Sequence, residues 1–334
     1  MLKLSDFDYI LPKEFIAQYP LKQRDHSRLL VLSRKTGSIN HTVFKDISAC
    51  FRAGDLLVLN DTKVEKSRLI GSRLTGGKAE VLLLNNKGGL TFEALIKPGR
   101  VKLNEKLIFN GGSVSCAVTG KNEVAFSARD REEIYNLGVM PLPPYIKRQA
   151  EDSDDLDYQT VYANNPGAVA SPTAGLHFTD TLLEKIRENG IEIVFVTLHV
   201  GHATFKPVKC EDVAKHSMEY EDFEITPGTY EKIKKAKAEK RRVIAVGTTS
   251  ARVLETLDYR QDKGHICAKT NLFIYPGYKF KNVGALITNF HLPRTTLLML
   301  VSAFAGKENI DTAYQEAIKE KYRFYSYGDA MLII

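Results

Sequence analysis

Polar residues that could take part in chemistry gather directly after four apolar segments of the sequence. Each apolar segment is typical of a buried strand, and the polar stretches that follow are 60–63, 199–205, 247–252 and 288–294. They are rich in Asp, Thr, His, Asn and Arg, with small residues between. Ligands of open α/β sheets bind beyond the carboxyl ends of the strands. We therefore expect one polar pocket at one edge of a sheet, and we place a fifth stretch, 171–178, beside it.

Three kinds of group in these stretches suit a substrate. Histidines supply bases that titrate near neutral pH, arginines and the amides at a helix start bind anions, and aromatic rings offer flat apolar faces. The histidines are His177, His199, His202 and His291, the arginines are Arg252 and Arg294, and the rings are Phe178, Phe205 and Phe290.

Each stretch taken alone also has a plainer explanation. Asn60-Asp61-Thr62 after a strand is typical of a turn, and Gly247-Thr248-Thr249-Ser250 before a helix is either an N-cap run or an anion site. A histidine can be a structural residue that is buried and hydrogen-bonded. These explanations would have to hold independently at every stretch, so their convergence favours a shared pocket.

Several chemistries lack their sequence signals. We expect no metal, because no two of the histidines stand four residues apart on a helix or form H-E-x-x-H. No pair of the four cysteines has C-x-x-C spacing, so neither a zinc knuckle nor a disulfide framework is indicated. The chain has no G-x-G-x-x-G, no G-x-x-x-x-G-K-[ST] and no G-x-S-x-G. These absences argue against a Rossmann dehydrogenase, a P-loop NTPase and an α/β-hydrolase.

The elements that would position the polar stretches follow an α/β pattern. Apolar runs predict strands at 56–59, 191–198, 243–246 and 285–287, and a hairpin joins 28–33 to 38–44. Helical patterns stand at 179–188, 250–259, 295–303 and, with many lysines, 229–242.

Residues 67–128 have a different sequence pattern. Glycine-rich turns there separate six apolar runs, and no helical pattern interrupts them, which is typical of a small antiparallel barrel. The runs are 68–74, 80–84, 91–96, 106–109, 114–118 and 123–126. The proline-rich segment 141–144 then acts as a stiff connector, because proline restricts φ and opposes helix formation.

Composition sets the remaining limits. The chain has 334 residues, of which 43% are hydrophobic and 26% charged, so it can bury a core and is long enough for about two domains. The start, MLKLSDFDYI, lacks the regions of a signal peptide, and no apolar run approaches the length of a membrane helix. We expect a cytoplasmic protein. The net charge of +7 permits a polyanionic partner without requiring one.

Ten segments in order carry a resemblance to a known family. They are LLVLNDTKV, PLPPY, YQTVYA, PTAGLHF, VTLHVG, VIAVGTT, FIYPGY, LITNFHLPR, LLMLVSAFAG and YRFYSYGDA, and they begin at residues 56, 141, 158, 172, 196, 243, 273, 286, 297 and 322. The chain closely resembles the S-adenosylmethionine:tRNA ribosyltransferase-isomerases of queuosine biosynthesis along nearly its whole length. It departs from the family pattern at Lys63, where arginine is usual, and at His202-Ala203, where the family has Ala-Gly.

The resemblance implies a fold and a reaction. The fold is α/β, a mixed sheet with flanking helices in a discontinuous domain of residues 1–64 and 150–334, with a six-stranded β-barrel inserted at 65–149. The reaction is a transfer and isomerisation of the ribosyl moiety of S-adenosylmethionine. The acceptor is 7-aminomethyl-7-deazaguanine at the wobble position of tRNA, and the products are epoxyqueuosine-tRNA, adenine and methionine. S-adenosylmethionine is then a cosubstrate, with no prosthetic group, and we expect a monomer.

Matching this reaction to the polar stretches gives role hypotheses. We expect His177 or His199 to move the proton and Asp61 to hold a ribose hydroxyl or the aminomethyl group. Arginine would clamp a carboxylate or phosphate, and Phe178 or Phe290 would stack on a base. The residues expected at S-adenosylmethionine are Thr62, Thr173, Gly175, Phe178, Thr248, Thr249, Arg252, Asn289, Phe290, His291 and Arg294.

Basic residues outside the pocket are candidates for docking tRNA. They lie on the helix within 232–242 and, on the barrel, at Lys97, Arg100, Lys102 and Lys106. Two other functions stay open at this point. One is RNA binding without catalysis, and the other is an enzyme for a small phosphorylated metabolite that binds its phosphate at 247–250.

Overall fold

The computed structural model describes residues 2–201, 208–259 and 264–334. His202 and Phe205, which the sequence analysis placed near the pocket, lie outside the described residues. Within them, no helix combines the length and the apolar composition needed to cross a membrane.

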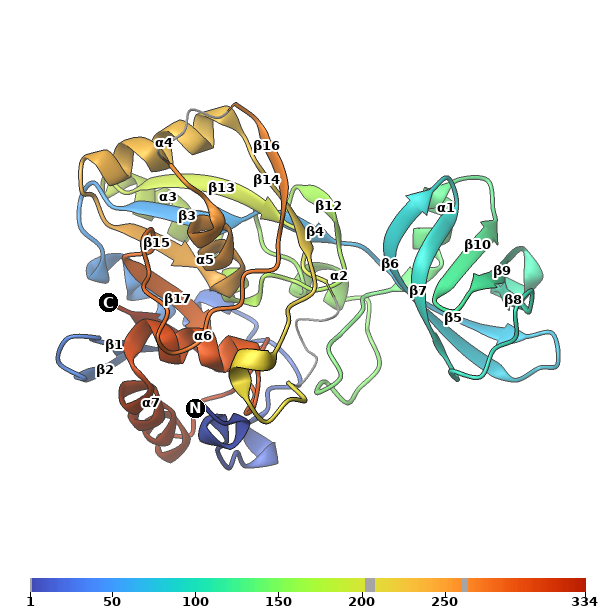
Figure 1. The fold of residues 1–334 in the computed structure, drawn as a ribbon, viewed down its shortest axis with the longest axis horizontal. Coiled ribbons are helices and arrows are strands. Elements are labelled where there is room, and N and C mark those ends of the chain that lie inside the picture. The colour runs from blue at the N-terminus through green and yellow to red at the C-terminus, as the bar shows by residue number, and fades with distance from the viewer. Residues whose placement is uncertain (1, 202–207, 260–263) are drawn as a thin grey trace.

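A nine-stranded mixed sheet forms the centre of the larger part of the molecule (Figure 1). Four neighbouring strands in its middle run parallel, and the strands toward both edges include antiparallel pairs. In spatial order the strands are β16 (Ile266–Thr270), β14 (Glu221–Ile225), β13 (Glu192–Leu198), β3 (Leu56–Asn60), β15 (Val243–Val246), β17 (Ala285–Asn289), β18 (Ala330–Ile333), β1 (Arg28–Leu32) and β2 (Ile39–Val43).

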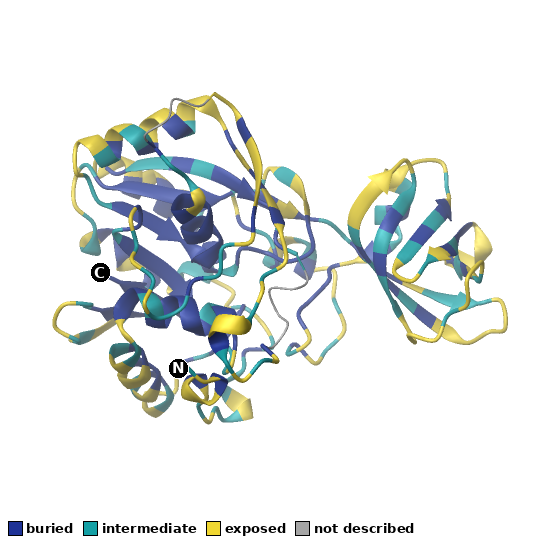
Figure 2. Ribbon diagram, in the orientation of Figure 1, coloured by how far each residue is buried: buried dark blue, intermediate teal, exposed yellow. Residues whose placement is uncertain are grey.

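Helices cover both faces of this sheet because its central strands are apolar on both sides. In β3, Leu56 and Val58 belong to one core and Leu57 and Leu59 to the other. Figure 2 shows the central strands as the largest continuous buried region. The first core takes in α4 (Pro227–Ala238), α5 (Gly247–Thr256), α6 (Thr296–Ala305) and α7 (Lys307–Lys319), and the second α3 (Asp180–Glu188) and the 3₁₀ helix Phe44–Cys50.

A separate antiparallel sheet closes into a barrel, seen beside the main body in Figure 1. Six strands close it, because β5 pairs with both β6 and β8, and a further short strand, β11 (Gly138–Val139), adds to β5. The six are β5 (Arg68–Arg73), β6 (Lys78–Gly88), β7 (Thr91–Lys97), β10 (Glu123–Ser127), β9 (Val114–Gly120) and β8 (Lys106–Phe109). The predicted fold class, α/β with a small antiparallel barrel, is confirmed, and the exact domain boundaries stay a prediction.

Two short parallel strands lie where the chain leaves the main sheet and where it returns. These are β4 (Thr62–Val64), which follows β3 and leads toward the barrel, and β12 (Asn165–Ala168). Two small helices, α1 (Arg131–Asn136) and α2 (Asp154–Asp157), lie between the barrel strands and β12 in the sequence.

Two helix predictions need correction. The helix predicted at 250–259 is α5, which begins three residues earlier because the backbone turns at Gly247, with φ +85°, directly after β15. The helix predicted at 229–242 is α4, which begins at Pro227 because Thr226 caps it and proline is favoured in the first turn. It ends at Ala238, and Lys240 then adopts a φ of +56°.

Candidate active site

The strand ends bring the predicted polar stretches to two neighbouring pockets that share Val200. The first, which we call the cleft, encloses about 890 Å³ of space, part of it open to solvent. It lies between the end of β13 and the barrel, with Asn85 and Glu93 on the barrel side. The second, which we call the α5 pocket, encloses about 630 Å³ at the start of α5.

His199 is the predicted histidine that lines the cleft. It follows β13, and its Nδ1 lies 2.9 Å from Oγ1 of Thr62, the first residue of β4. Its Nε2 makes no hydrogen bond to any described residue. Gly167 of β12 packs against the ring, where a Cβ atom would lie 3.0 Å from both Cε1 and Nδ1. The φ of +138° at this position also favours glycine.

The protonation of His199 suits a general base. Burial lowers its pKa from the ordinary value, and the carboxylates of Asp222, Asp61 and Glu224 oppose that shift. The imidazole is therefore neutral at physiological pH and able to accept a proton. The Thr62 hydroxyl lies 3.5 Å from the main-chain oxygen of Asn165, a long contact that favours donation in that direction. Nδ1 of His199 would then donate to Thr62, which leaves Nε2 as the basic nitrogen.

Asp61 lies between β3 and β4, directly before Thr62, which contacts His199. Its carboxylate accepts hydrogen bonds from Oγ1 of Thr197 at 2.6 Å and from Nδ2 of Asn165 at 3.1 Å. Burial raises its pKa, and these two hydrogen bonds and His199 counteract the rise. Asp61 is half-buried, and each of its two carboxylate oxygens accepts one of these hydrogen bonds.

The α5 pocket collects a second set of predicted residues. Its walls include Thr173, Thr248, Thr249, Asn289, Phe290 and His291. Oγ1 of Thr249 and Oγ of Ser171 are buried here without a hydrogen-bond partner among the described residues. No described side chain caps the first turn of α5, and the turn itself contains no acidic residue. Free amides and unpartnered hydroxyls of this kind suit a carboxylate or another anion.

His177, the second candidate for the proton shuttle, is held on both sides by the surrounding fold, which favours a positioning role. It is 4% exposed, and both ring nitrogens are engaged. Nδ1 lies 2.8 Å from Oγ of Ser27, and Nε2 accepts from Nδ2 of Asn289 at 3.0 Å. Burial lowers its pKa to about 3, so it stays neutral. Asn289 in turn accepts from Thr173 at 2.9 Å, so His177 positions two walls of the α5 pocket.

His291 is also a poor candidate for proton transfer. It lines the α5 pocket, but its Nε2 lies 2.7 Å from Oγ1 of Thr288, and burial lowers its pKa to about 3. Phe290 forms part of the same wall, although its ring is buried among Tyr314, Tyr322 and Phe324.

Neither predicted arginine lines the cleft or the α5 pocket as the described residues form them. The Arg252 guanidinium is buried, pairs with Glu221, and donates to the main-chain oxygen of Leu272 at 3.0 Å. It therefore has no free edge for a substrate anion. Arg294 is exposed and pairs with Asp8, with Nε 2.9 Å from a carboxylate oxygen. Both arginines therefore pair with carboxylates of the protein, and the partner of Arg252, Glu221, itself lines the cleft.

Three further assignments change for reasons of burial. Phe178 is fully buried in the core, edge-on to Phe44, so it offers no face to a base. Gly175 lines neither pocket, and a Cβ there would lie 2.1 Å from the hydroxyl of Tyr162, so this glycine serves packing. Thr62 is fully buried and acts through His199.

Several residues of the site were not predicted. Gly167 and Asn165 come from β12, which has no clear strand pattern in the sequence, and Asn85 and Glu93 come from the barrel. Tyr325 and Ser326 of the α5 pocket stand in YRFYSYGDA, a segment that the resemblance already marked.

Comparison with known proteins identifies the family of the chain. A family model described as "Queuosine biosynthesis protein" matches residues 4–333. The chain belongs to this family. Proteins named S-adenosylmethionine:tRNA ribosyltransferase-isomerase from Carboxydothermus hydrogenoformans and Halothermothrix orenii are 50% and 51% identical to it, over the full length of both chains.

A solved member of the family has the same overall fold. The crystal structure of S-adenosylmethionine tRNA ribosyltransferase from Thermotoga maritima is 37% identical, with a TM-score of 0.57. The match covers 98% of this chain and 100% of that one. The resemblance in the ten ordered segments is thus confirmed over the whole chain.

Proposed function

We propose that this protein transfers and isomerises the ribosyl moiety of S-adenosylmethionine onto tRNA in queuosine biosynthesis. The acceptor is the amine of 7-aminomethyl-7-deazaguanine at the wobble position, and epoxyqueuosine, adenine and methionine are the products. The observation that carries the proposal is His199, a neutral imidazole in the cleft whose Nε2 makes no hydrogen bond to a described residue. Family membership supports the choice of substrates.

His199 takes the proton that the reaction must release first. A carbon next to a sulfonium is acidic, so a base can remove a proton from C5′ of S-adenosylmethionine. Nε2 of His199 accepts this proton, while Thr62 and Gly167 fix the plane of the ring. Positioned proton transfer of this kind contributes about 10²- to 10⁴-fold to a rate.

The two pockets divide the remaining work. The methionine carboxylate fits the α5 pocket, where no described side chain caps the helix start and the Thr249 hydroxyl has no partner among the described residues. The cleft receives the modified base, whose aminomethyl group is cationic until it loses a proton. Glu93 and Asp222 line the cleft, and Asp61 lies beside it. The negative charges of these carboxylates suit the cationic amine. The amine then attacks the ribosyl carbon, adenine leaves, and closure of the epoxide expels methionine.

The barrel supplies better candidates for contact with tRNA phosphates than α4 does. Lys232 and Arg241 both pair with Glu192, and the Lys237 ammonium contacts Asn282. The barrel residues Arg100, Lys102 and Lys106 are exposed. We therefore assign the electrostatic docking of tRNA mainly to the barrel.

A salt titration compares these two surfaces. Removing two phosphate contacts reduces the magnitude of the slope of log affinity against log salt by about 1.4 to 1.8. We expect this loss for tRNA binding in a Lys102→Ala, Lys106→Ala variant. The matched variant Lys232→Ala, Lys235→Ala on α4 keeps the wild-type slope. Equal slopes in all three proteins, or a loss only in the α4 variant, would overturn the barrel assignment.

One incubation tests the reaction itself. The protein is mixed with S-adenosylmethionine and tRNA that carries 7-aminomethyl-7-deazaguanine, and a parallel sample contains tRNA with guanine at that position. We expect epoxyqueuosine in the digested tRNA, with free adenine and methionine in equal amounts, only in the first sample. Binding of tRNA without product would favour an RNA-binding protein without catalysis. Neither binding nor product would favour a small phosphorylated metabolite.

The protein acts as a monomer in this proposal, because residues of one chain line both pockets. Light scattering during size-exclusion chromatography measures the mass directly. Both substrates are cytoplasmic, and we place the reaction there.

A further inference from the structure

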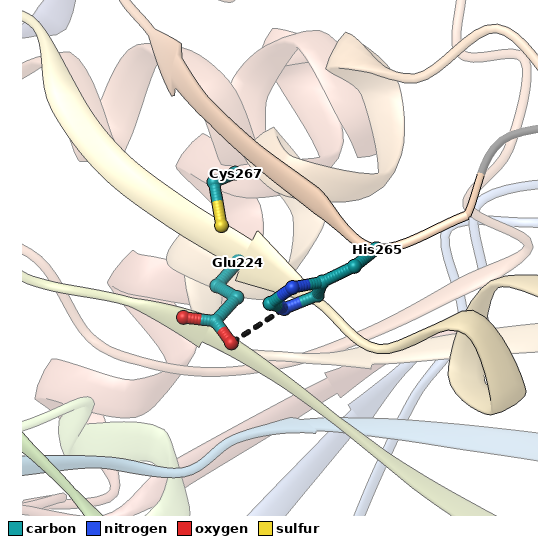
Figure 3. A group of neighbouring side chains, drawn as sticks. All are labelled: Glu224, His265 and Cys267. Atoms are coloured by element: carbon teal, nitrogen blue, oxygen red, sulfur yellow. Dashed lines mark hydrogen bonds and ion pairs between the residues drawn. The ribbon is translucent and has the colours of Figure 1, made fainter.

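Three side chains with metal-binding atoms meet on the outer ribbon of the nine-stranded sheet, and none of the three lines the cleft or the α5 pocket. They are Glu224 of β14, His265 just before β16, and Cys267 within β16 (Figure 3). One ligand atom from each lies within 4.8 Å of those of the other two. Nε2 of His265 is 2.6 Å from a carboxylate oxygen of Glu224. We propose that these three residues form a binding site for Zn²⁺.

Strand pairing explains why the three side chains share one face. Glu224 and Cys267 are direct partners in the antiparallel ladder of β14 and β16. His265 stands two residues before Cys267, so its side chain points to the same side of the ribbon. The alternate residues Phe223, Ile225 and Ile266 are buried on the opposite face. The cluster therefore follows from the register and needs no rearrangement of the backbone.

The donor set selects the class of metal. Thiolate, imidazole and carboxylate together suit Zn²⁺, whereas Ca²⁺ and Mg²⁺ prefer oxygen atoms alone. Three protein ligands leave a fourth tetrahedral position for water. Cys267 is the exposed cysteine of the four in the chain, and all three ligands are open to solvent, so an ion can reach them. Zn²⁺ displaces the thiol proton, so its binding releases a proton and strengthens as the pH rises.

Within the part of the chain that the structure describes, the cluster consists of these three residues. The next outward pair along the same ladder is Asp222 and Lys269, whose charged groups lie 3.2 Å apart. Asp222 is the next carboxylate on this face of β14, and its ion pair with Lys269 makes it unsuitable as a fourth ligand. Glu224 lies opposite Thr197 of β13, which in turn bonds to Asp61. The cluster is therefore about two strand spacings, roughly 10 Å, from Asp61.

The sequence by itself predicts no metal, because neither the pocket histidines nor the cysteines stand at metal-site spacing along the chain. Here one ligand comes from a different strand, more than 40 residues earlier. Binding at this place would join the edge strand β16 to β14, and its test does not depend on the proposed ribosyl transfer.

Zinc affinity of tag-free protein tests the proposal. The protein is freed of metal with a chelator and titrated with Zn²⁺ in competition with a chromophoric chelator. We expect one tight equivalent per chain, and at least a 100-fold weaker affinity in His265→Ala and in Cys267→Ser. Two controls should retain the wild-type affinity. Cys210→Ser removes a half-buried thiol, and His41→Ala removes a histidine that pairs with Glu316 without a cysteine.

Cobalt provides a second measurement that identifies the ligand. Co²⁺ bound to a thiolate gives a sulfur-to-metal charge-transfer band in the near ultraviolet. We expect this band in the wild type and in Cys210→Ser, and its loss in Cys267→Ser. The proposal is overturned if the wild type binds Zn²⁺ no tighter than Cys267→Ser does, or if the band persists in that variant.

Discussion

Nδ1 of His199 is held 2.9 Å from the buried hydroxyl of Thr62, and Nε2, the other ring nitrogen, makes no hydrogen bond to a described residue. This relationship separates His199 from His177, whose two nitrogens are both engaged by Ser27 and Asn289. A base needs a free nitrogen next to the substrate. The two histidines, equivalent as candidates in the sequence, therefore have different tasks.

Substitution of each histidine should distinguish these tasks. We expect His199→Ala to lower kcat by about 10²- to 10⁴-fold with little change in unfolding free energy. His177→Ala should lose about 1–3 kcal/mol of stability, because it leaves buried polar groups without partners, and its folded fraction should keep kcat within about tenfold. Single-turnover kinetics and urea unfolding measure the two quantities. The assignment fails if folded His177→Ala is as inactive as His199→Ala.

Asp61 should influence the pH at which His199 becomes protonated. Its negative charge favours the imidazolium, so Asp61→Asn should lower the pKa of His199 further. Activity requires neutral His199 and is lost as the pH falls through its pKa. The acidic limb of the profile of kcat against pH should therefore move to lower pH. Asp311→Asn, which alters an exposed carboxylate on α7, serves as the control and should leave the limb in place.

Gly167 should be intolerant of a side chain because it packs against His199. An alanine Cβ would lie 3.0 Å from the ring, so we expect Gly167→Ala to displace the imidazole and lower kcat about 10- to 100-fold. Gly277→Ala is the matched control, with a φ of +105° and open space around the position. It should show similar backbone strain in thermal unfolding, with unchanged kcat. Equal losses of kcat in both variants would mean that strain, and not His199, is responsible.

Acid should destabilise the protein through His177 and His291. Both have a pKa of about 3 when folded and an ordinary value near 6.5 when unfolded. Between pH 3 and pH 6.5 the unfolded chain binds more protons at these histidines than the folded chain does. Their contribution to the free energy of unfolding is therefore fully present above pH 6.5 and declines as the pH falls below it. The expected slope is about 1.4 kcal/mol per pH unit for each histidine. Urea unfolding from pH 7 to pH 4 measures this slope. His291→Asn should reduce it by the share of one histidine, about 1.4 kcal/mol per pH unit.

Arg252 should matter for stability and not for binding S-adenosylmethionine. Arg252→Met leaves the buried Glu221 without its guanidinium partner, at a cost of about 3–5 kcal/mol. Arg294→Ala breaks an exposed pair with Asp8 and should cost no more than about 1 kcal/mol. Urea unfolding and calorimetric titration with S-adenosylmethionine compare the two. A weaker affinity in folded Arg252→Met without a loss of stability would restore Arg252 as a clamp.

Local sequence patterns were sufficient for most of the barrel and the central strands. All six barrel runs became strands, because alternating apolar residues and glycine-rich turns act over a few residues. The edge strand β16 had no such pattern, since three of its five residues are exposed. The short strand β12 was also missed, because Asn165, Pro166 and Gly167 rank among the poorest strand formers. Its place depends on β4, about 100 residues earlier.

The sequence by itself determined that polar groups gather at strand ends, and the ordered segments indicated the family. Only the tertiary structure decided which of those groups meet a ligand. Burial and hydrogen bonding depend on residues far apart in the chain: Ser27 and Asn289 enclose His177, Glu221 holds Arg252, and Thr62 orients His199. Residue type states what a side chain can do, and its tertiary partners determine whether it remains free to do it.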